Sequence, residues 1–191
     1  MTLDERAAAY STVFPKYPSL WFDKGWLMGV WVLGALYKRQ RADFYGAYPG
    51  NYLKRVYALF PDRIADDTLH LFSGTLQGVG GGVTVDINPA LQPAVVADAK
   101  RLPFPDGGLF SLIFADPPYS AKDAENYGTP MISRRHVVAE ARRVVHPGAH
   151  LCWLDTVRPM YSKRLWKQVG AIMVLVSTNT RTRCLSIFEA V

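Results

Sequence analysis

The sequence predicts an α/β fold in which a mostly parallel sheet ends in a closing antiparallel hairpin. The first observation is a series of short apolar runs between residues 68 and 155. These runs are continuous rather than alternating, which is typical of strands covered on both faces. The second observation is that an acidic residue or a glycine follows most of them, where open parallel sheets bind ligands. We therefore predict a single domain over 1–191, with a helical N-terminal extension over 1–62 and a core over 66–191.

Aromatic residues are concentrated in the N-terminal extension, which contains more than half of the chain's Trp, Tyr and Phe residues. We expect one helix over Trp26–Gln40, ending in a basic cluster, because cations suit a helix C-terminus. A second helix is expected over Asn51–Phe60, where Pro61 stops it. The most apolar stretch, Trp26–Tyr37, is about twelve residues long, whereas a membrane span needs roughly 20. We interpret it as a buried or interface helix.

From residue 68 onward, short apolar runs alternate with turns. The expected strands are Thr68–Phe72, Val83–Ile87, Ala94–Ala97, Leu109–Ala115 and His150–Asp155. Ser133–Val145 has one apolar stripe and a serine that can cap it, so we expect a helix that ends at Pro147-Gly148. Another helix is expected over Tyr161–Val169, with Gly170 as its stop. The closing hairpin consists of Ala171–Ser177, the polar turn Thr178–Thr182 and Arg183–Ala190.

Composition and charge limit the class of protein. The chain is 49% hydrophobic and 20% charged, which excludes wholesale disorder. Its net charge of +6, from 22 Lys and Arg against 16 Asp and Glu, favours a polyanionic partner, although a basic protein without nucleic acid has the same charge. Cys152 and Cys184 form neither a disulfide framework nor a closed zinc site. Since MTLDERAAAY contains no signal peptide, we expect a cytoplasmic protein without a membrane segment.

Two motifs carry the chemistry. The tetrapeptide Asp116-Pro117-Pro118-Tyr119 follows the fourth predicted strand, and the turn Phe72-Ser73-Gly74-Thr75 follows the first. In this order, with Asp86 and Asp98 after the strands between them, the sequence resembles the class I S-adenosylmethionine-dependent methyltransferases. More narrowly, it resembles the amino-methyltransferases of exocyclic nucleobase nitrogens, whose hallmark is this tetrapeptide. The resemblance covers about Thr68–Val191 and implies a Rossmann-like sheet, S-adenosyl-L-methionine as cofactor and a catalytic role for the core.

The implied cofactor site begins at the turn formed by Phe72, Ser73, Gly74 and Thr75. Gly74 allows the backbone to turn tightly and to approach a ligand closely. In families that place a cofactor-contacting segment before the core, this segment would correspond by position to Tyr48 and Pro49.

Four further residues extend the implied cofactor site. Asp86 can accept hydrogen bonds from both ribose hydroxyls, and Ile87 would pack against the adenine ring. Asp98, followed by Ala99, would accept a hydrogen bond from the adenine amino group. Either acid can instead be an ordinary turn or cap residue.

Asp116 is the centre of the implied reaction, and it also belongs to the implied cofactor site. An exocyclic amine is a poor nucleophile because its lone pair is delocalised into the ring. Hydrogen bonds to the Asp116 carboxylate and the Pro117 carbonyl would hold the nitrogen toward tetrahedral geometry, with its lone pair facing the sulfonium methyl. Pro117 and Pro118 stiffen the backbone, and Tyr119 offers a flat face for stacking on an extruded base.

The sequence departs from this family in two ways. Leu76–Gly82 and Asn88–Pro93 are too short for the usual crossover helices, so two flanking helices are expected to be truncated or absent. The aromatic N-terminal helices, or a second subunit in a homodimer, could cover the face left bare. The chain also has no segment for recognising a target sequence. Specificity would then be short or weak or come from a partner, unless the substrate is structured RNA recognised by shape.

Other polar residues carry weaker signals. Ser120–Pro130 is either a mobile loop over the target base or an ordinary surface loop. Arg134-Arg135-His136 opens a helix, where cations oppose the helix dipole, so contact with phosphates is one explanation. The remaining basic residues are interpreted as solvated faces: Arg158, Lys163, Arg164, Lys167, Arg181 and Arg183. His70, His146 and His150 show no metal-ligand grouping and are expected to be structural.

These observations leave several functions open. The leading hypothesis is methylation of DNA, at adenine N6 first and cytosine N4 second, because Asp in the first tetrapeptide position leans toward adenine within the resemblance. An RNA methyltransferase acting on guanine N2 or adenine N6 is the closest rival. A protein glutamine methyltransferase is less favoured, since that family typically has Asn in place of Asp116. The alternative of a different class is a non-catalytic methyltransferase-fold subunit that binds nucleic acid.

Overall fold

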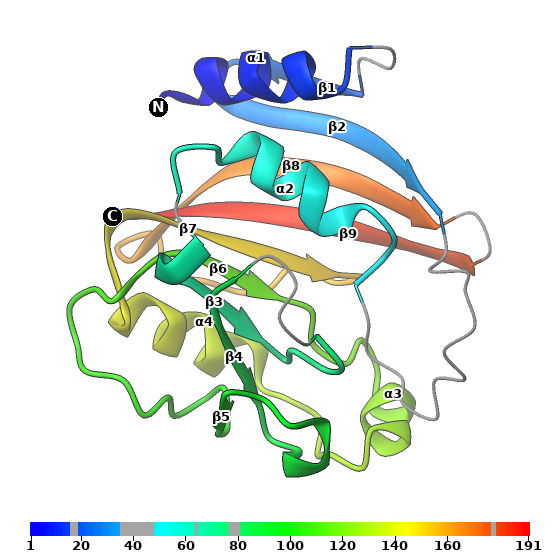
Figure 1. Ribbon diagram of the computed structural model, residues 1–191, viewed down its shortest axis with the longest axis vertical. Helices are drawn as coiled ribbons and strands as arrows, with labels where there is room; N and C mark the ends of the chain where they lie inside the picture. The colour runs from blue at the N-terminus through cyan, green and yellow to red at the C-terminus, as the bar shows by residue number, and fades with distance from the viewer. Residues whose placement is uncertain (16–18, 35–47, 64, 77–80, 177–178) are drawn as a thin grey trace.

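The computed structural model describes residues 1–15, 19–34, 48–63, 65–76, 81–176 and 179–191. The strands are β1 (Leu20–Asp23), β2 (Trp26–Leu33), β3 (Thr68–Leu71), β4 (Val83–Asp86), β5 (Val95–Val96), β6 (Phe110–Ala115), β7 (Val145–Asp155), β8 (Trp166–Val176) and β9 (Asn179–Ala190). They form one sheet in the order β1-β2-β8-β9-β7-β6-β3-β4-β5 (Figure 1). The helices are α1 (Leu3–Val13), α2 (Tyr52–Leu59), α3 (Ala121–Asn126) and α4 (Arg134–Arg143), with 3₁₀ turns η1 (Ala65–Asp67) and η2 (Pro89–Leu91).

The parallel half of the sheet agrees with the sequence pattern. β5, β4, β3, β6 and β7 run parallel to one another, with Leu69 opposite Ile113 and Ile113 opposite Leu151. Every residue of β3 and β6 is buried, which explains the continuous apolar runs. β7 begins earlier than predicted, because Pro147 and Gly148 lie within this strand rather than at the end of a helix.

The closing hairpin is confirmed: β9 lies between β7 and β8 and is antiparallel to both. The helix predicted over Tyr161–Val169 is wrong, because β8 already begins at Trp166, which lies opposite Ala190 of β9. Gly170 therefore does not stop a helix. A Cβ at this position would lie 3.0 Å from the carbonyl oxygen of Leu27 in β2, so the glycine allows two strands to approach closely.

The N-terminal extension also differs from the prediction. Trp26–Leu33 is a strand, β2, not the start of a helix, and residues 35–40 of the predicted helix lie outside the described residues. Its exposure alternates along the strand, as expected for β structure rich in Val and Trp. β2 pairs in parallel with β8, and β1 pairs with β2 in antiparallel orientation. Tertiary pairing thus converts an apolar run that looked helical into a sheet extension.

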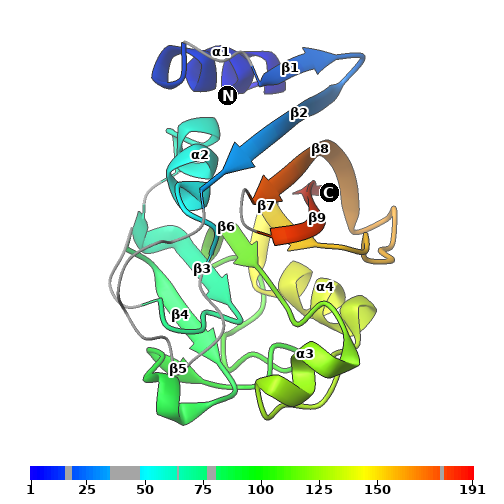
Figure 2. The same ribbon diagram turned by 90° about the vertical axis from the view of Figure 1, so that its right-hand side faces the viewer.

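Helices cover the two faces of the sheet unequally (Figure 2). α4 packs Val137, Val138 and Ala141 against one face of the parallel strands. On the other face, α2 and the preceding Tyr48 pack against Phe114 of β6, as the sequence predicted for the aromatic extension. Between β3 and β4 the described residues contain no helix, and η2 is the short turn between β4 and β5, so the expected truncation is confirmed.

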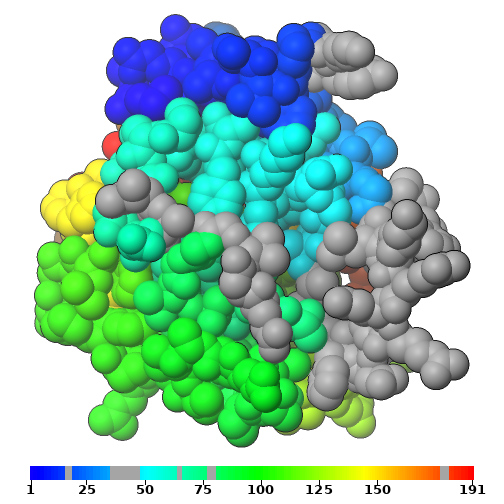
Figure 3. Space-filling view, in the orientation of Figure 1, coloured from blue at the N-terminus to red at the C-terminus, as the bar shows by residue number. Residues whose placement is uncertain are grey.

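α1 is joined to the body of the protein by an ion pair. The Arg6 guanidinium donates to both carboxylate oxygens of Asp62, at 2.5 and 2.9 Å, and to the carbonyl of Leu59 at the end of α2. Figure 3 shows the N-terminal segment, in blue and cyan, forming one end of the molecule. None of the described helices is long and apolar enough to cross a membrane.

Candidate active site

A cavity of about 570 Å³ lies at the carboxyl ends of the parallel strands. It brings together most of the predicted site residues: Tyr48, Phe72, Gly74, Asp86, Ile87, Asp98, Ala99, Asp116, Pro117, Pro118 and Tyr119. Pro49, Ser73 and Thr75 are not among the lining residues; Ser73 is buried and Thr75 is exposed. Residues that are far apart in the sequence thus meet at one edge of the sheet, as the strand order predicts.

Asp86 holds the turn after β3. Its Oδ2 accepts a hydrogen bond from the backbone N–H of Gly74 at 3.0 Å, and its Oδ1 accepts one from the N–H of Asn88 at 3.0 Å. Gly74 has φ of +56°, a conformation that favours glycine, as the tight turn requires. The carboxylate therefore organises the glycine turn and its own loop, and keeps lone pairs for a ligand.

The neighbouring wall of the cavity consists of an exposed apolar side chain, Ile87, and an ion pair between Asp98 and Lys100. Ile87 is 44% exposed although it is apolar, so it offers a surface for a flat ligand. Asp98 caps its own loop by accepting from the N–H of Lys100 at 2.9 Å, and it forms an ion pair with the Lys100 ammonium at 3.3 Å. Asp98 therefore has the turn role that the sequence left open, in addition to facing the cavity.

Tyr48 forms the side of the cavity nearest the N-terminal extension. Its ring stacks on Tyr52 at 5.3 Å and meets Phe114 edge-on. Its hydroxyl lies 3.5 Å from Nδ1 of His70, a ring that stacks on Phe114. Burial raises the pKa of Tyr48, so the phenol stays neutral. An aromatic cluster thus fixes this wall of the cavity and the position of Tyr48, which was predicted from the sequence to belong to a cofactor-contacting segment before the core.

The tetrapeptide places a carboxylate and a phenol in direct contact. The Tyr119 hydroxyl donates to Oδ1 of Asp116 at 2.5 Å. Burial raises the pKa of Asp116 to about 7, while the hydrogen bond from Tyr119 and the nearby Arg183 cation lower it. Burial and the adjacent carboxylate raise the pKa of Tyr119, so the phenol remains the donor. Asp116 is therefore a carboxyl group that gains or loses its proton near neutral pH.

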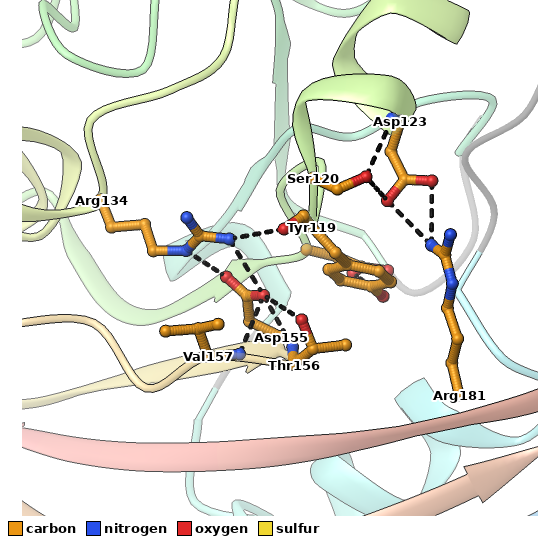
Figure 4. Close-up of polar contacts among 9 residues, drawn as sticks. Tyr119, Ser120, Asp123, Arg134, Asp155, Thr156, Val157 and Arg181 are labelled. Carbon is orange, nitrogen blue, oxygen red and sulfur yellow. Dashed lines mark hydrogen bonds and ion pairs between the residues drawn. The ribbon is translucent and has the colours of Figure 1, made fainter.

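Arg134 has an internal role rather than the phosphate contact suggested by its sequence position. Its Nε donates to Oδ2 of Asp155 at 2.7 Å, and its Nη2 donates to the Tyr119 carbonyl at 3.0 Å (Figure 4). Asp155 is buried at the end of β7 and also accepts from the N–H groups of Thr156 and Val157. This cluster connects the start of α4, the end of β7 and the tetrapeptide Asp116–Tyr119.

Arg183 is a cavity residue that sequence reasoning assigned to a solvated face. Its guanidinium lies over the Tyr119 ring, 5.2 Å from the ring centroid, and it lines the cavity. The assignment is wrong because β9 runs between β7 and β8, which brings this strand beside the tetrapeptide. The apolar pattern of the hairpin does not reveal that Arg183 lines a cavity. The signal available in the sequence was a charged residue within a predicted strand of the sheet, since charged side chains are rarely buried without a specific role.

The segment after the tetrapeptide, expected to be a loop throughout, begins with the short helix α3 and continues as irregular chain from Tyr127. The Ser120 side chain caps this helix at the N–H of Asp123, and the Arg181 guanidinium binds the Asp123 carboxylate at 2.8 Å (Figure 4). Residues 126–132, which follow, line the cavity. Sequence reasoning did not include them among the site residues.

The histidines have the structural environment that was expected of them. His70 is fully buried and His150 nearly so, and burial lowers their pKa values to about 4 and about 3. His146 Nδ1 donates locally to the Pro147 carbonyl at 2.8 Å. Within the described ranges, no group of His, Cys, Asp and Glu could hold a metal ion.

Comparison with known proteins supports the fold. No protein-family model and no curated protein sequence matches the chain. Among solved structures, TrmN from Thermus thermophilus matches with a TM-score of 0.54 and 17% identity over 72% of this chain and 48% of TrmN. The chain thus spans about half the length of TrmN.

Two further structures match less well. A SAM-dependent methyltransferase from Aquifex aeolicus has a TM-score of 0.43 and 15% identity over 72% of this chain and 88% of that one. Geranyl diphosphate C-methyltransferase from Streptomyces coelicolor A3(2), in complex with Mg²⁺, geranyl diphosphate and S-adenosyl-L-homocysteine, has a TM-score of 0.42 and 10% identity over 100% of both chains. The chain has the Rossmann-like fold that is also found in the methyltransferase structure TrmN from Thermus thermophilus, with its candidate site at the carboxyl ends of the parallel strands.

Proposed function

We propose that this protein is an S-adenosyl-L-methionine-dependent methyltransferase that modifies an exocyclic amino group of a nucleobase in DNA, adenine N6 first and cytosine N4 second. The observation that carries this proposal is the contact between Asp116 and Tyr119 in a cavity shared with Gly74, Asp86 and Ile87. A carboxylate can accept a hydrogen bond from the amino group of a nucleobase, and an aromatic ring can stack on the planar base.

The residues around the cavity fit the cofactor. The Asp86 carboxylate, fixed by Gly74 and Asn88, would hold the ribose hydroxyls, and Ile87 would cover one face of the adenine. Asp98 and the backbone at Ala99 would meet the adenine edge. When bound, the cofactor supplies an electrophilic methyl group on its sulfonium. The chain's own task is then to position and activate the acceptor nitrogen.

Asp116 performs that task in the proposed reaction. Its ionised carboxylate accepts a hydrogen bond from the target amine, together with the Pro117 carbonyl, and holds the nitrogen with its lone pair free. After transfer the nitrogen carries an extra proton, and Asp116, whose pKa is near 7, can receive it. The Tyr119 hydroxyl orients the carboxylate by donating to Oδ1. Arg134 holds the Tyr119 carbonyl and thereby the backbone of the tetrapeptide.

Two other candidates remain as alternatives. Structured RNA is the second choice of substrate, because the Asp116 carboxylate and the Tyr119 ring suit an aminated base in either polymer and structured RNA can be recognised by shape. A non-catalytic nucleic-acid-binding subunit is disfavoured by the pKa of Asp116, since a carboxyl group poised near neutrality is typical of a working site.

A protein partner, either a second copy or a specificity subunit, is supported by one surface. The exposed face of β1, β2 and β8 is apolar, with Trp21, Trp26, Val30, Val32 and Met173 between 37% and 64% exposed. We propose that the protein acts in the cytoplasm with such a partner. Sedimentation of the purified protein over a concentration series, alone and with the Val32→Asp and Met173→Asp variants, would detect self-association through this face.

The function is tested with isotope-labelled S-adenosyl-L-methionine. The protein is incubated with unmethylated DNA and separately with unmodified RNA, and the labelled nucleoside is identified by mass spectrometry after digestion. We expect N6-methyldeoxyadenosine or N4-methyldeoxycytidine, and no label with Asp116→Asn. Label confined to RNA would assign the second candidate. The methylation assay is repeated with cell extract added as a source of partners. If protein that binds the cofactor in calorimetry still transfers no label, the proposal is overturned.

A further inference from the structure

Arg183 lies in the active-site cavity, and the proposed reaction does not yet use it. It stands on β9 opposite Val174 of β8, and its guanidinium covers the ring of Tyr119. Tyr119 in turn donates to Asp116, and the Arg183 cation lowers the pKa of that carboxyl group. The three side chains form one continuous surface that combines a hydrogen-bond acceptor, a flat ring and a hydrogen-bond donor.

Two of the donors on Arg183 have no protein partner. Nε and Nη1 are both withdrawn from solvent, and neither finds an acceptor among the residues that the structure describes. Buried N–H groups are nearly always paired in folded proteins, so two unpaired groups on one guanidinium need an explanation. Arg181, two residues earlier on the same strand, instead uses its guanidinium to bind Asp123. Arg183 lines the cavity beside Tyr119, so a ligand bound there can come within reach of its guanidinium.

The chemistry of an aminated base matches this arrangement. The target amine is a donor and suits the Asp116 carboxylate. Beside that amine, adenine carries the acceptor nitrogens N1 and N7, and cytosine carries N3. A guanidinium has N–H donors and no acceptor, so it suits these ring nitrogens. Thymine and uracil place a carbonyl where the amine should be, which would face the carboxylate.

We propose that Arg183 is a substrate-binding residue that donates a hydrogen bond to the ring nitrogen beside the target amine. This inference rests on the proposed function and extends it, because it assigns recognition of the aminated edge to a pair of residues, Asp116 and Arg183. It also gives β9 a role in base selection.

The experiment combines a variant of the protein with an altered base. Arg183→Gln removes the cation, and Arg181→Gln removes one cation from the same strand outside the cavity as the matched control. The substrate is the oligonucleotide that the wild-type protein methylates, with the target replaced by 1-deazaadenine or 7-deazaadenine, or by 3-deazacytosine. Each analogue replaces one ring nitrogen by C–H and keeps the amine.

One analogue should lower the wild-type kcat/KM by about 10- to 100-fold, as expected when a buried donor loses its acceptor. Arg183→Gln should lower kcat/KM on the natural base by a similar factor, and the same analogue should then cause less than about a twofold further loss, because the partner is already absent. Arg181→Gln should retain the full analogue effect. Thermal unfolding and cofactor binding of both variants check that the fold is kept, and Arg183→Met, which keeps the aliphatic stem without a donor, replaces the glutamine variant if it does not fold.

Three results would overturn the inference. An analogue loss of the same size in wild type and Arg183→Gln would show that Arg183 does not contact that nitrogen. Arg183→Gln could instead lower kcat/KM by the same factor on the natural base and on every analogue, and also reduce the salt dependence of KM. That result would assign Arg183 to a phosphate contact. Absence of any methyl transfer by the wild-type protein would remove the proposed function itself, and this outcome is visible before any variant is made.

Discussion

The Arg134 guanidinium is paired with the buried carboxylate of Asp155, with Nε and Oδ2 2.7 Å apart. The same guanidinium donates to the Tyr119 carbonyl, so the ion pair joins the helix α4, the strand β7 and the tetrapeptide Asp116–Tyr119. A charge that seemed available for nucleic acid is instead part of the scaffold that positions Asp116.

Arg134→Met should destabilise the protein and disturb the active site together. The substitution leaves Asp155 buried without its counter-charge, and a loss of roughly 2–4 kcal/mol in the free energy of unfolding is expected. The adjacent Arg135 is exposed, so Arg135→Met should change stability by less than about 0.5 kcal/mol. Urea unfolding measures both. Equal, small effects of the two variants would contradict a structural role for the pair.

Asp116→Asn should stabilise the protein at alkaline pH. The folded pKa of about 7 lies above the ordinary value of 3.8, so folding disfavours the ionised carboxylate. Stability is therefore highest when Asp116 is protonated and falls as pH rises from about 4 to about 7, by at most about 4 kcal/mol. The variant should be more stable than wild type at pH 8 and equal to it near pH 4. The exposed Asp23→Asn is the control, and a wild-type advantage at pH 8 would contradict the assignment.

Methyl transfer should require the ionised form of Asp116. We expect kcat/KM to fall about tenfold per pH unit below the pKa of about 7 and to level off above it. Asp116→Asn should be inactive throughout the pH range while still binding the cofactor. A rate that does not change between pH 5 and 8 would mean that this carboxyl group takes no part in the step.

Tyr119 contributes a hydroxyl and a ring, and two variants separate them. Tyr119→Phe removes the hydrogen bond that lowers the pKa of Asp116, so the acid limb of the pH–rate profile should move to higher pH while activity at high pH is largely kept. Tyr119→Ala also removes the ring and should lower kcat/KM about 10- to 100-fold at every pH, since base stacking contributes about 1–3 kcal/mol. Similar profiles for the two variants would show that the ring carries no stacking role.

Asp86→Asn should weaken cofactor binding more than it weakens the fold. The amide can replace only one of the two acceptors that hold Gly74 and Asn88. We expect an approximately 10- to 100-fold rise in the cofactor dissociation constant, corresponding to about 1.4–2.8 kcal/mol. Isothermal titration calorimetry measures it, with exposed Asp66→Asn as the control. An unchanged dissociation constant would place the cofactor elsewhere.

Sequence alone determined the parallel core and most of the candidate site. Short, mostly apolar runs identify β3, β4 and β6, because strands covered on both faces bury most of their side chains; every residue of β3 and β6 is buried. The turn at Gly74 and the tetrapeptide at Asp116 follow those strands directly, so parallel strand ends bring them to one edge. These features depend on short stretches of chain, which is why they can be predicted from local patterns.

Tertiary structure decided the parts that depend on long-range pairing. Trp26–Leu33 and the region from Trp166 become strands because β2 and β8 pair with each other across most of the chain, a contact that overrides local helical patterning. The same pairing accounts for Gly170 as a point of close strand approach. Arg134 and Arg183 carry ordinary surface charges in the sequence, and it is the meeting of α4, β7 and β9 at the tetrapeptide that gives each its place beside Tyr119. A side chain's partner is set by the path of the whole chain, and no local window of sequence contains that path.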